Sequence, residues 1–136
     1  HLLTAQLAQA RSTAIMRRVP VTLCPSQGDG RCSTSQDWSD GWIVYRDPAR
    51  SDHPGSREDI LAEVRQPIHA SVRILSSSGR TRVRYQPDGR SAGTNLTLRI
   101  CQDGQLGGQV ILNNVGRTRS TRPTAPLDCN EASADG

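Results

Sequence analysis

The chain of 136 residues contains no lysine and no phenylalanine, and it has only two tryptophans and two tyrosines. Because large aromatic side chains are scarce, the core has to be built mainly from leucine, valine, isoleucine and alanine, and we expect it to be thin. No run of 18 apolar residues occurs, so no part of this stretch could span a bilayer as a helix. No secretory signal peptide is visible. The length predicts one domain.

Sequence motifs of catalysis and cofactor binding are also absent. There is no G-x-S-x-G elbow, no phosphate-binding G-x-x-x-x-G-K-[ST] loop and no G-x-G-x-x-G fingerprint. The glycine-rich segment Asp103–Gly108 is predicted to be a hairpin loop. His1, His53 and His69 show no metal-ligand spacing, and acid pairs such as Glu58 and Asp59 are typical of solvated loops. We therefore expect no enzyme, no metal and no cofactor.

Four cysteines, at positions 24, 32, 101 and 129, contain no C-x-x-C pair, and their spacing disfavours a zinc site. Cysteines in a chain with a thin core indicate an oxidising compartment. Three disulfide connectivities are open, of which Cys24 with Cys32 and Cys101 with Cys129 is the most local. Loop entropy gives these two bridges about 2.6 and about 3.6 kcal/mol. From Thr124 onward the tail is small and polar, with Cys129 as its only expected anchor.

All 17 basic residues of the chain are arginine. Together with 13 acidic residues they give a net charge of +4 and a pI near 9.3. This balance favours polyanionic partners, and guanidinium groups suit bidentate contacts with phosphate. Three arginines, Arg117, Arg119 and Arg122, fall within the stretch VGRTRSTRP of residues 115–123. The alternative is a solvated tail in a chain whose composition simply favours arginine over lysine.

Periodicity predicts an α+β protein in which an N-terminal helix packs on antiparallel β-sheets. Over residues 3–18, Leu3, Leu7, Ala10 and Ala14 recur at helical spacing, and Pro20 ends the helix. The segment 60–64 is ambiguous between a helical turn and a strand. Strands are expected at residues 21–24, 42–45, 71–75, 81–85, 95–101 and 109–112.

The strand expected over residues 81–85 alternates between two faces. Val83 and Tyr85 point one way, and Arg80, Arg82 and Arg84 point the other. A solvated strand face is the simpler interpretation of this arginine row. The same three residues are also candidates for additional contacts with an anionic partner.

Five segments of the chain, taken together and in order, form a familiar set. They are AQARSTAIMRRVPVTLCPS (8–26), DGRC (29–32), DWSDGWIVYRD (37–47), LRICQDG (98–104) and VGRTR (115–119). The set resembles the minor type IV pilins of the FimT family, which belongs to the wider GspH/FimT group of pilins and pseudopilins. The segments are spread over about four fifths of the chain, and their order makes an accidental resemblance improbable.

The resemblance implies a pilin architecture. Residues 1–18 would be the C-terminal part of a hydrophobic N-terminal helix, and residues 19–136 a β-rich head with a disulfide-tethered tail. That helix, cleaved by a prepilin peptidase after export, would anchor the protein in the bacterial inner membrane and pack in the pilus, and its membrane half would precede residue 1. The expected locations are inner membrane, periplasm and extracellular pilus, with other major and minor pilins as partners.

The resemblance also implies a function, because FimT heads bind DNA during natural transformation through a G-R-x-R element. Here that element is Gly116–Arg119, and Arg122 extends it, while the hydroxyls of Ser120 and Thr121 supply neutral hydrogen bonds to phosphate. If Cys101 pairs with Cys129, both ends of the segment are held. We expect DNA binding that is independent of base sequence.

The alternative is a structural minor pilin or pseudopilin, of a type IV pilus or of type II secretion, that primes fibre assembly without binding DNA. In that case the arginines are solvated or contact neighbouring subunits.

Overall fold

The computed structural model describes residues 2–65, 72–77, 81–91 and 95–129. Within them, helix α1 covers Leu2–Arg17 and a short 3-10 helix covers Arg57–Asp59. The strands are β1 Val21–Pro25, β2 Gly41–Arg46, β3 Ile60–Arg65, β4 Val72–Ser76, β5 Val83–Tyr85, β6 Leu96–Gln102, β7 Gln105–Leu112 and β8 Thr118–Thr121.

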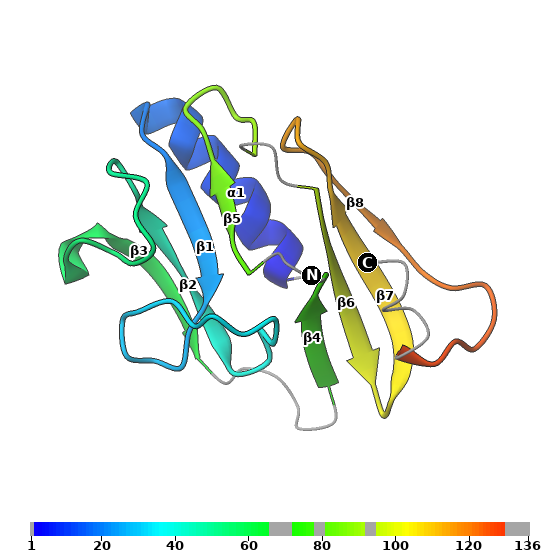
Figure 1. Ribbon diagram of the computed structural model, residues 1–136. Helices are drawn as coiled ribbons and strands as arrows, with labels where there is room; N and C mark the ends of the chain where they lie inside the picture. Colours follow the sequence, from blue (N-terminus) through cyan, green and yellow to red (C-terminus); the bar gives the residue numbers. More distant parts are fainter. Residues whose placement is uncertain (1, 66–71, 78–80, 92–94, 130–136) are drawn as a thin grey trace.

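These strands form two antiparallel sheets that lie side by side (Figure 1). The first has the order β3-β2-β1-β5 and the second β4-β6-β7-β8. Helix α1 contacts β1 and β5 of the first sheet and β8 of the second. The helix therefore packs against both sheets, and the predicted α+β class is confirmed.

The predicted apolar face of the helix is the buried one. Leu3, Leu7, Ala10 and Ala14 are at most 2% exposed. The helix ends at Arg17, and Arg18 then adopts a left-handed conformation with φ of 55°. Pro20 follows and prevents further helix. The spacing alone was sufficient to identify this face, because a single stripe of a 3.6-residue helix faces the core.

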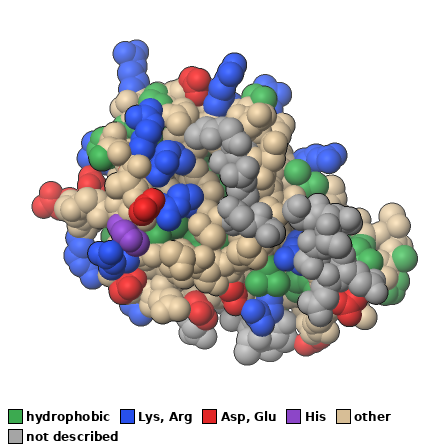
Figure 2. All heavy atoms as spheres, in the orientation of Figure 1, with side chains coloured by type: hydrophobic (Ala, Val, Ile, Leu, Met, Phe, Trp, Pro, Cys, Tyr) green, Lys and Arg blue, Asp and Glu red, His purple; other side chains and the backbone are tan. Residues whose placement is uncertain are grey.

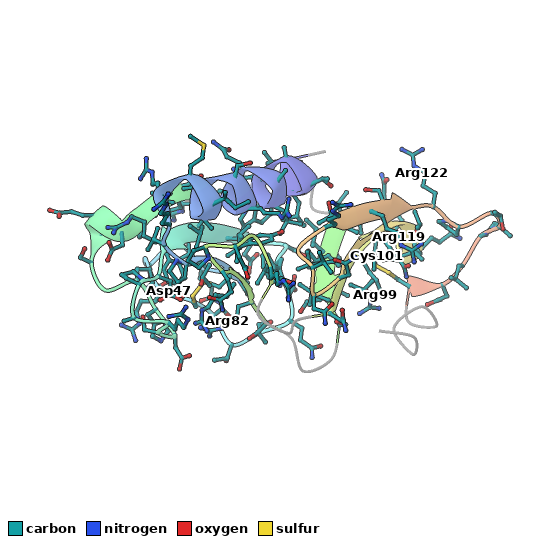
Figure 3. All side chains as sticks on the ribbon, turned by 90° about the horizontal axis from the view of Figure 1, so that it is seen from above. Asp47, Arg82, Arg99, Cys101, Arg119 and Arg122 are labelled. Carbon is teal, nitrogen blue, oxygen red and sulfur yellow. A yellow bond between two sulfur atoms is a disulfide. The ribbon has the colours of Figure 1, made fainter. Side chains whose placement is uncertain are left out.

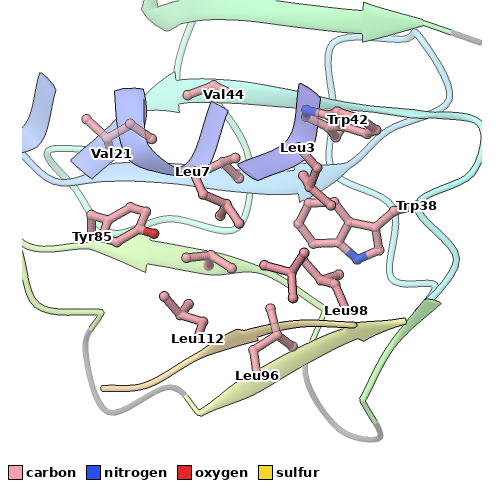
Figure 4. Close-up of a cluster of buried hydrophobic side chains, with 14 of the residues drawn as sticks. Leu3, Leu7, Val21, Trp38, Trp42, Val44, Tyr85, Leu96, Leu98 and Leu112 are labelled. Atoms are coloured by element: carbon pink, nitrogen blue, oxygen red, sulfur yellow. The ribbon is translucent and has the colours of Figure 1, made fainter. Parts of the chain in front are cut away.

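The core joins the helix to the inner faces of both sheets (Figure 4). Trp38 and Trp42 lie at its centre with their ring centroids 6.5 Å apart. Leu98 and Leu112 reach this cluster from the second sheet. All four aromatic side chains of the chain, including Tyr45 and Tyr85, are at most 1% exposed. The few aromatic residues of the chain thus all lie in the buried interior.

A second connection between the sheets runs through the segment before β2. Trp38 donates its backbone N–H to the carbonyl of Ile74 in β4 at 2.8 Å. Asp37 forms an ion pair with Arg73 at 2.7 Å. Partial burial acts to raise the pKa of Asp37, but hydrogen bonds from Ser39 and the charge of Arg73 hold it below its usual value. The edge of the second sheet is therefore fixed to the first by backbone and by charge.

Six strands occur where the sequence predicts them, with shifted ends, and the ambiguous segment 60–64 is strand β3. The prediction of a loop over Asp103–Gly108 is wrong, because β7 already begins at Gln105. Asp103 and Gly104 alone make the turn, with φ of 52° and 81°. Positive φ at both positions is typical of the tight type I′ hairpin turn, which a D-G pair favours. Strand β8 was not predicted.

The arginine row on β5 is not a solvated face. Asp47, which is 2% exposed, accepts hydrogen bonds from Arg84 Nε at 2.9 Å, Thr22 Oγ1 at 2.8 Å and the Ser51 N–H at 2.8 Å. Arg82 pairs with Asp52 at 3.3 Å. The loop after β2 supplies both carboxylates, and the sequence could not show that this loop folds over β5. Arg80 lies outside the described residues.

Replacing Asp47 with asparagine should destabilise the fold strongly, because the change keeps the shape but leaves the Arg84 charge without its anionic partner. We expect a loss of about 3 kcal/mol in the free energy of unfolding, measured by urea denaturation with the disulfides intact. Asp52→Asn is the matched control. Its carboxylate is 84% exposed, and the expected loss is below about 1 kcal/mol. Equal losses for the two variants would contradict the assignment.

Candidate nucleic-acid interface

The predicted G-R-x-R element forms the turn and the return strand of the β7–β8 hairpin. Asn113 donates its N–H to the Arg117 carbonyl at 3.1 Å, and Gly116 donates to the Asn113 carbonyl at 2.9 Å. The loop is therefore residues 114–116, with Gly116 in a left-handed conformation at φ of 95°. Three-residue hairpin loops of this kind require a residue with positive φ at their last position. This requirement explains the glycine before the arginines.

The side chain of Asn113 holds the loop from within. Its Oδ1 accepts the N–H of Val115 at 3.2 Å and that of Arg117 at 3.1 Å. The loop is also fixed from outside, since Ser91 donates its N–H to the Asn114 carbonyl at 3.3 Å. The arginines therefore start from an ordered turn.

Gly116 has a second reason to be glycine. A Cβ at this position would overlap the carbonyl oxygen of Gly89, in the loop between β5 and β6. The same carbonyl accepts a hydrogen bond from Arg11 Nε of helix α1 at 3.0 Å. Arg11 also acts on the hydroxyl of Tyr85 in β5: burial raises the pKa of Tyr85, and the positive charge of Arg11 lowers it. Helix, β5–β6 loop and hairpin turn thus meet at one point.

The register of β8 decides which way its side chains point. Thr118 lies opposite Leu112 and Ser120 opposite Val110, whereas Arg119 lies opposite Ile111. Leu112 and Val110 belong to the core, so Thr118 and Ser120 are on the face of the sheet that carries the helix. Arg119 is on the other face, the outer face. Arg117 lies opposite Asn113 and two residues before Arg119. Because side chains alternate along an extended chain, Arg117 shares the outer face with Arg119.

Arg122 comes directly after β8 and points to the opposite side. It lines a groove on the helix side of the sheet together with Thr4, Val110 and Ser120. Figure 3 shows Arg122 extending on the helix side and Arg119 on the other side of β8. The structure therefore brings Arg117 and Arg119 together on one face and separates Arg122 from them.

These three arginines differ electrostatically from those of the first sheet. Arg117, Arg119 and Arg122 are exposed, and within the described residues none of them forms an ion pair. The sequence from Gly104 to Leu127 contains no acidic residue. Over the first sheet, by contrast, arginine and acidic side chains are mixed (Figure 2). Arg84 lies in β5 of that sheet and Arg82 directly before it. Figure 3 shows Arg82 far from Arg119, so this part of the molecule does not adjoin the C-terminal arginines.

The groove beside Arg122 has a volume of about 580 Å³. Ile100 and Val110 supply apolar wall, and Ser120 supplies a hydroxyl group from the helix side of β8. Thr4 also lines the groove, but its Oγ1 is buried and has no hydrogen-bond partner among the described residues. With Ser120 and Arg122 on its wall, the groove can accept a polar or anionic group next to a guanidinium.

Both disulfides have the most local connectivity, Cys24 with Cys32 and Cys101 with Cys129. The second links β6 to the chain beyond the arginines. Arg99, only 6% exposed, donates from Nη1 to the Cys129 carbonyl at 2.9 Å. The arginine segment is thus enclosed between the hairpin and a covalent bridge.

The tail has more anchors than Cys129 alone, contrary to the expectation. Leu106 donates its N–H to the Leu127 carbonyl at 2.9 Å, and Cys129 donates to the Gly104 carbonyl at 3.0 Å. Leu127 also packs, partly buried, on the cluster of Cys101, Leu106 and Cys129. The single leucine in the polar tail was the available signal for this contact.

Within the described part of the chain, no group of three or more histidine, cysteine, aspartate or glutamate side chains could hold a metal ion. His53 accepts the backbone N–H of Cys32 through Nδ1 at 3.1 Å, and His1 and His69 lie outside the described residues. Among those residues, no helix combines the length and the apolar character needed to cross a bilayer.

Sequence reasoning missed three residues that shape this interface. Asn113, Gly89 and Arg11 fix the hairpin turn, although none of them belongs to the arginine cluster. For Asn113 a signal existed, because N-N-V-G between two strands is typical of a turn. The contact of Arg11 with Gly89 joins residues 78 positions apart and has no local signal.

Comparisons with known proteins agree with this architecture. The family described as "Type II transport protein GspH" matches residues 1–116, a range that ends just before Arg117. The type IV minor pilin FimU of Pseudomonas aeruginosa superposes with a TM-score of 0.74 at 21% identity, over 93% of this chain and 89% of that one. A second crystal form of FimU gives a TM-score of 0.64.

The minor pseudopilin EpsH from the type 2 secretion system of Vibrio cholerae superposes with a TM-score of 0.60 at 12% identity, over 90% of this chain and 93% of that one. No curated protein matches the sequence. At these identities the solved structures show a common fold.

Gly116→Ala should cost more stability than Gly104→Ala. Both glycines have positive φ, but a Cβ at Gly104 meets no atom within 4 Å, whereas one at Gly116 overlaps the Gly89 carbonyl. The left-handed conformation costs each variant about 1 kcal/mol. The overlap adds at least about 1 kcal/mol at Gly116. Thermal unfolding of the two variants measures the difference, and equal shifts would show that the contact with Gly89 has no energetic role.

Proposed function

The chain belongs to the GspH family, and from that premise we propose that it is a minor pilin of a type IV pilus that binds DNA during uptake in natural transformation. The head holds DNA through Arg117, Arg119 and Arg122, and Gly116 shapes the turn that presents them. Before assembly the protein resides in the inner membrane and periplasm of a bacterium, and afterwards in the extracellular pilus with other pilins.

The observation that supports this proposal is the set of exposed arginines that form no ion pair within the described part of the chain. An arginine already paired with a carboxylate would have to give up that partner before binding phosphate, as Arg84 would with Asp47. Arg117, Arg119 and Arg122 carry no such cost, since the described residues offer them no carboxylate. We therefore leave Arg82 and Arg84 out of the proposed contacts.

The composition of the surface favours contacts with the DNA backbone over contacts with bases. All four aromatic side chains of the chain are buried in the core, so none of them can stack on a base. Ser120 and Thr121 add hydroxyl groups, which commonly bind phosphate oxygens. Contacts of this kind carry little sequence information and suit the uptake of arbitrary DNA.

Three phosphate contacts set the expected strength. They predict a slope of log affinity against log salt of about −2.7 on duplex DNA, and non-specific dissociation constants of about 10⁻⁴ to 10⁻⁶ M. One head therefore binds weakly. Several heads, or neighbouring pilins that add their own contacts, would bind firmly through multivalency.

A purely structural role in priming a pilus or a secretion pseudopilus is the second candidate. It is favoured by the shared fold with FimU and EpsH and by apolar side chains exposed on helix α1. Met16 is 81% exposed, Leu2 47% and Ile15 42%. Ile15 and Met16 are adjacent, and exposed apolar side chains that lie together can mark contacts with other proteins. This role does not require the acid-free arginine segment.

Replacing both Arg117 and Arg119 with alanine should weaken DNA binding and flatten its salt dependence, because two phosphate contacts are lost. Fluorescence anisotropy of labelled duplex DNA across a salt series measures both quantities. We expect the slope to fall in magnitude by about 2. The matched control is Arg31→Ala/Arg57→Ala, which removes the same charge from exposed positions elsewhere, in the loop before β2 and at the start of the 3-10 helix. An equal loss in the control would indicate a general charge effect and exclude a defined site.

Removing the bridge with Cys101→Ser/Cys129→Ser should weaken DNA binding while the β-structure persists. Without the bridge, the chain after β8 is freer, and binding has to order Arg122 and its neighbours. We expect a roughly threefold to tenfold loss of affinity for duplex DNA, with an unchanged far-ultraviolet circular dichroism spectrum as control for folding. Unchanged affinity in a folded variant would exclude a role of the tether in binding.

A further inference from the structure

The opposite orientations of Arg119 and Arg122 carry an inference about the form of DNA, which rests on the proposed DNA binding. We propose that β8 enters the major groove of duplex DNA edge-on. Arg117 and Arg119 then contact the phosphates of one strand, and Arg122 contacts those of the other strand. The preferred ligand is therefore a duplex.

The position of β8 in the sheet permits this approach. It is the last strand of the order β4-β6-β7-β8, so within the described residues its other edge has no strand partner. Thr118 and Ser120 face the helix side, and Arg119 faces the outer side. The free edge of β8 thus lies between the outer face, which carries Arg117 and Arg119, and the helix-side face, which carries Arg122. Both faces end at this edge of the sheet.

The dimensions of a sheet fit those of the major groove. Stacked sheets lie about 10 Å apart, so side chains of ordinary length reach about 5 Å from the backbone, and extended arginines reach further. Guanidinium groups on opposite faces are then separated by more than about 10 Å. The major groove is about 12 Å wide and admits a β-ribbon, whereas the minor groove is about 6 Å wide. The separation matches the two phosphate walls of the major groove.

The groove on the helix side gives the second strand a place to lie. It borders Arg122, and Ser120 lines it from the helix side of β8. The exposed Ser120 hydroxyl can donate a hydrogen bond to a phosphate oxygen there. The outer face offers Arg117 and Arg119 to the first strand. Each wall of the DNA groove thus meets at least one guanidinium.

A single strand presents only one row of phosphates. It can follow the outer face past Arg117 and Arg119, but it does not reach Arg122 across the edge at the same time. With all four aromatic residues buried, the head has no stacking surface that would compensate. The contribution of Arg122 should therefore depend on the second strand.

The test compares Arg122→Ala with Arg119→Ala on a duplex and on one of its strands at equal length, by fluorescence anisotropy across a salt series. We expect Arg122→Ala to reduce the magnitude of the salt slope by about 1 on the duplex and to leave it unchanged on the single strand. Arg119→Ala should reduce the slope on both DNAs. Arg31→Ala serves as the charge control. An equal effect of Arg122→Ala on both DNAs would overturn the proposal.

A second measurement addresses the groove itself. Duplex DNA containing glucosylated 5-hydroxymethylcytosine has its major groove filled by sugar, and the wild-type head should bind it several-fold more weakly than unmodified duplex. Equal affinity for the two duplexes would overturn insertion into the major groove. Failure of the wild-type head to bind either DNA would instead overturn the proposed function.

Discussion

The close approach of Gly116 to the carbonyl of Gly89 is the contact on which the arrangement of the C-terminal arginines depends. It is possible only without a Cβ at position 116, and it places the hairpin turn against a carbonyl that Arg11 of the helix also binds. From this fixed turn, β8 returns along β7 in a defined register. The register then determines the face on which each arginine lies.

The same residue type serves two purposes in the two sheets. In the first sheet, Arg84 is bound to the buried Asp47 and contributes to folding. In the second sheet, Arg117, Arg119 and Arg122 stand in a stretch without acidic residues. The net charge of the chain does not reveal this division. It follows from where the carboxylates are placed, since the loop after β2 brings them to β5, whereas no described carboxylate forms an ion pair with Arg119 of β8.

The sequence was sufficient for the helix, its buried face and most strands, because each of these depends on spacing within a short segment. The observed disulfide pairing was one of three connectivities that the sequence left open. Strand β8 was missed because its residues, TRST, contain no apolar side chain that could show alternation. Without the strand, Arg119 and Arg122 could not be assigned to opposite faces. The pairing of Arg84 with Asp47 was missed for another reason, since the two residues are 37 positions apart.

The bridge between Cys101 and Cys129 also has a mechanical meaning. A load applied to the arginines would tend to unzip an edge strand from its single neighbour, one hydrogen bond at a time. Because the chain beyond β8 is covalently joined to β6, which lies inside the sheet, such unzipping is limited to the segment between the hairpin turn and the bridge. Tension on a bound polymer is then carried by the interior of the head.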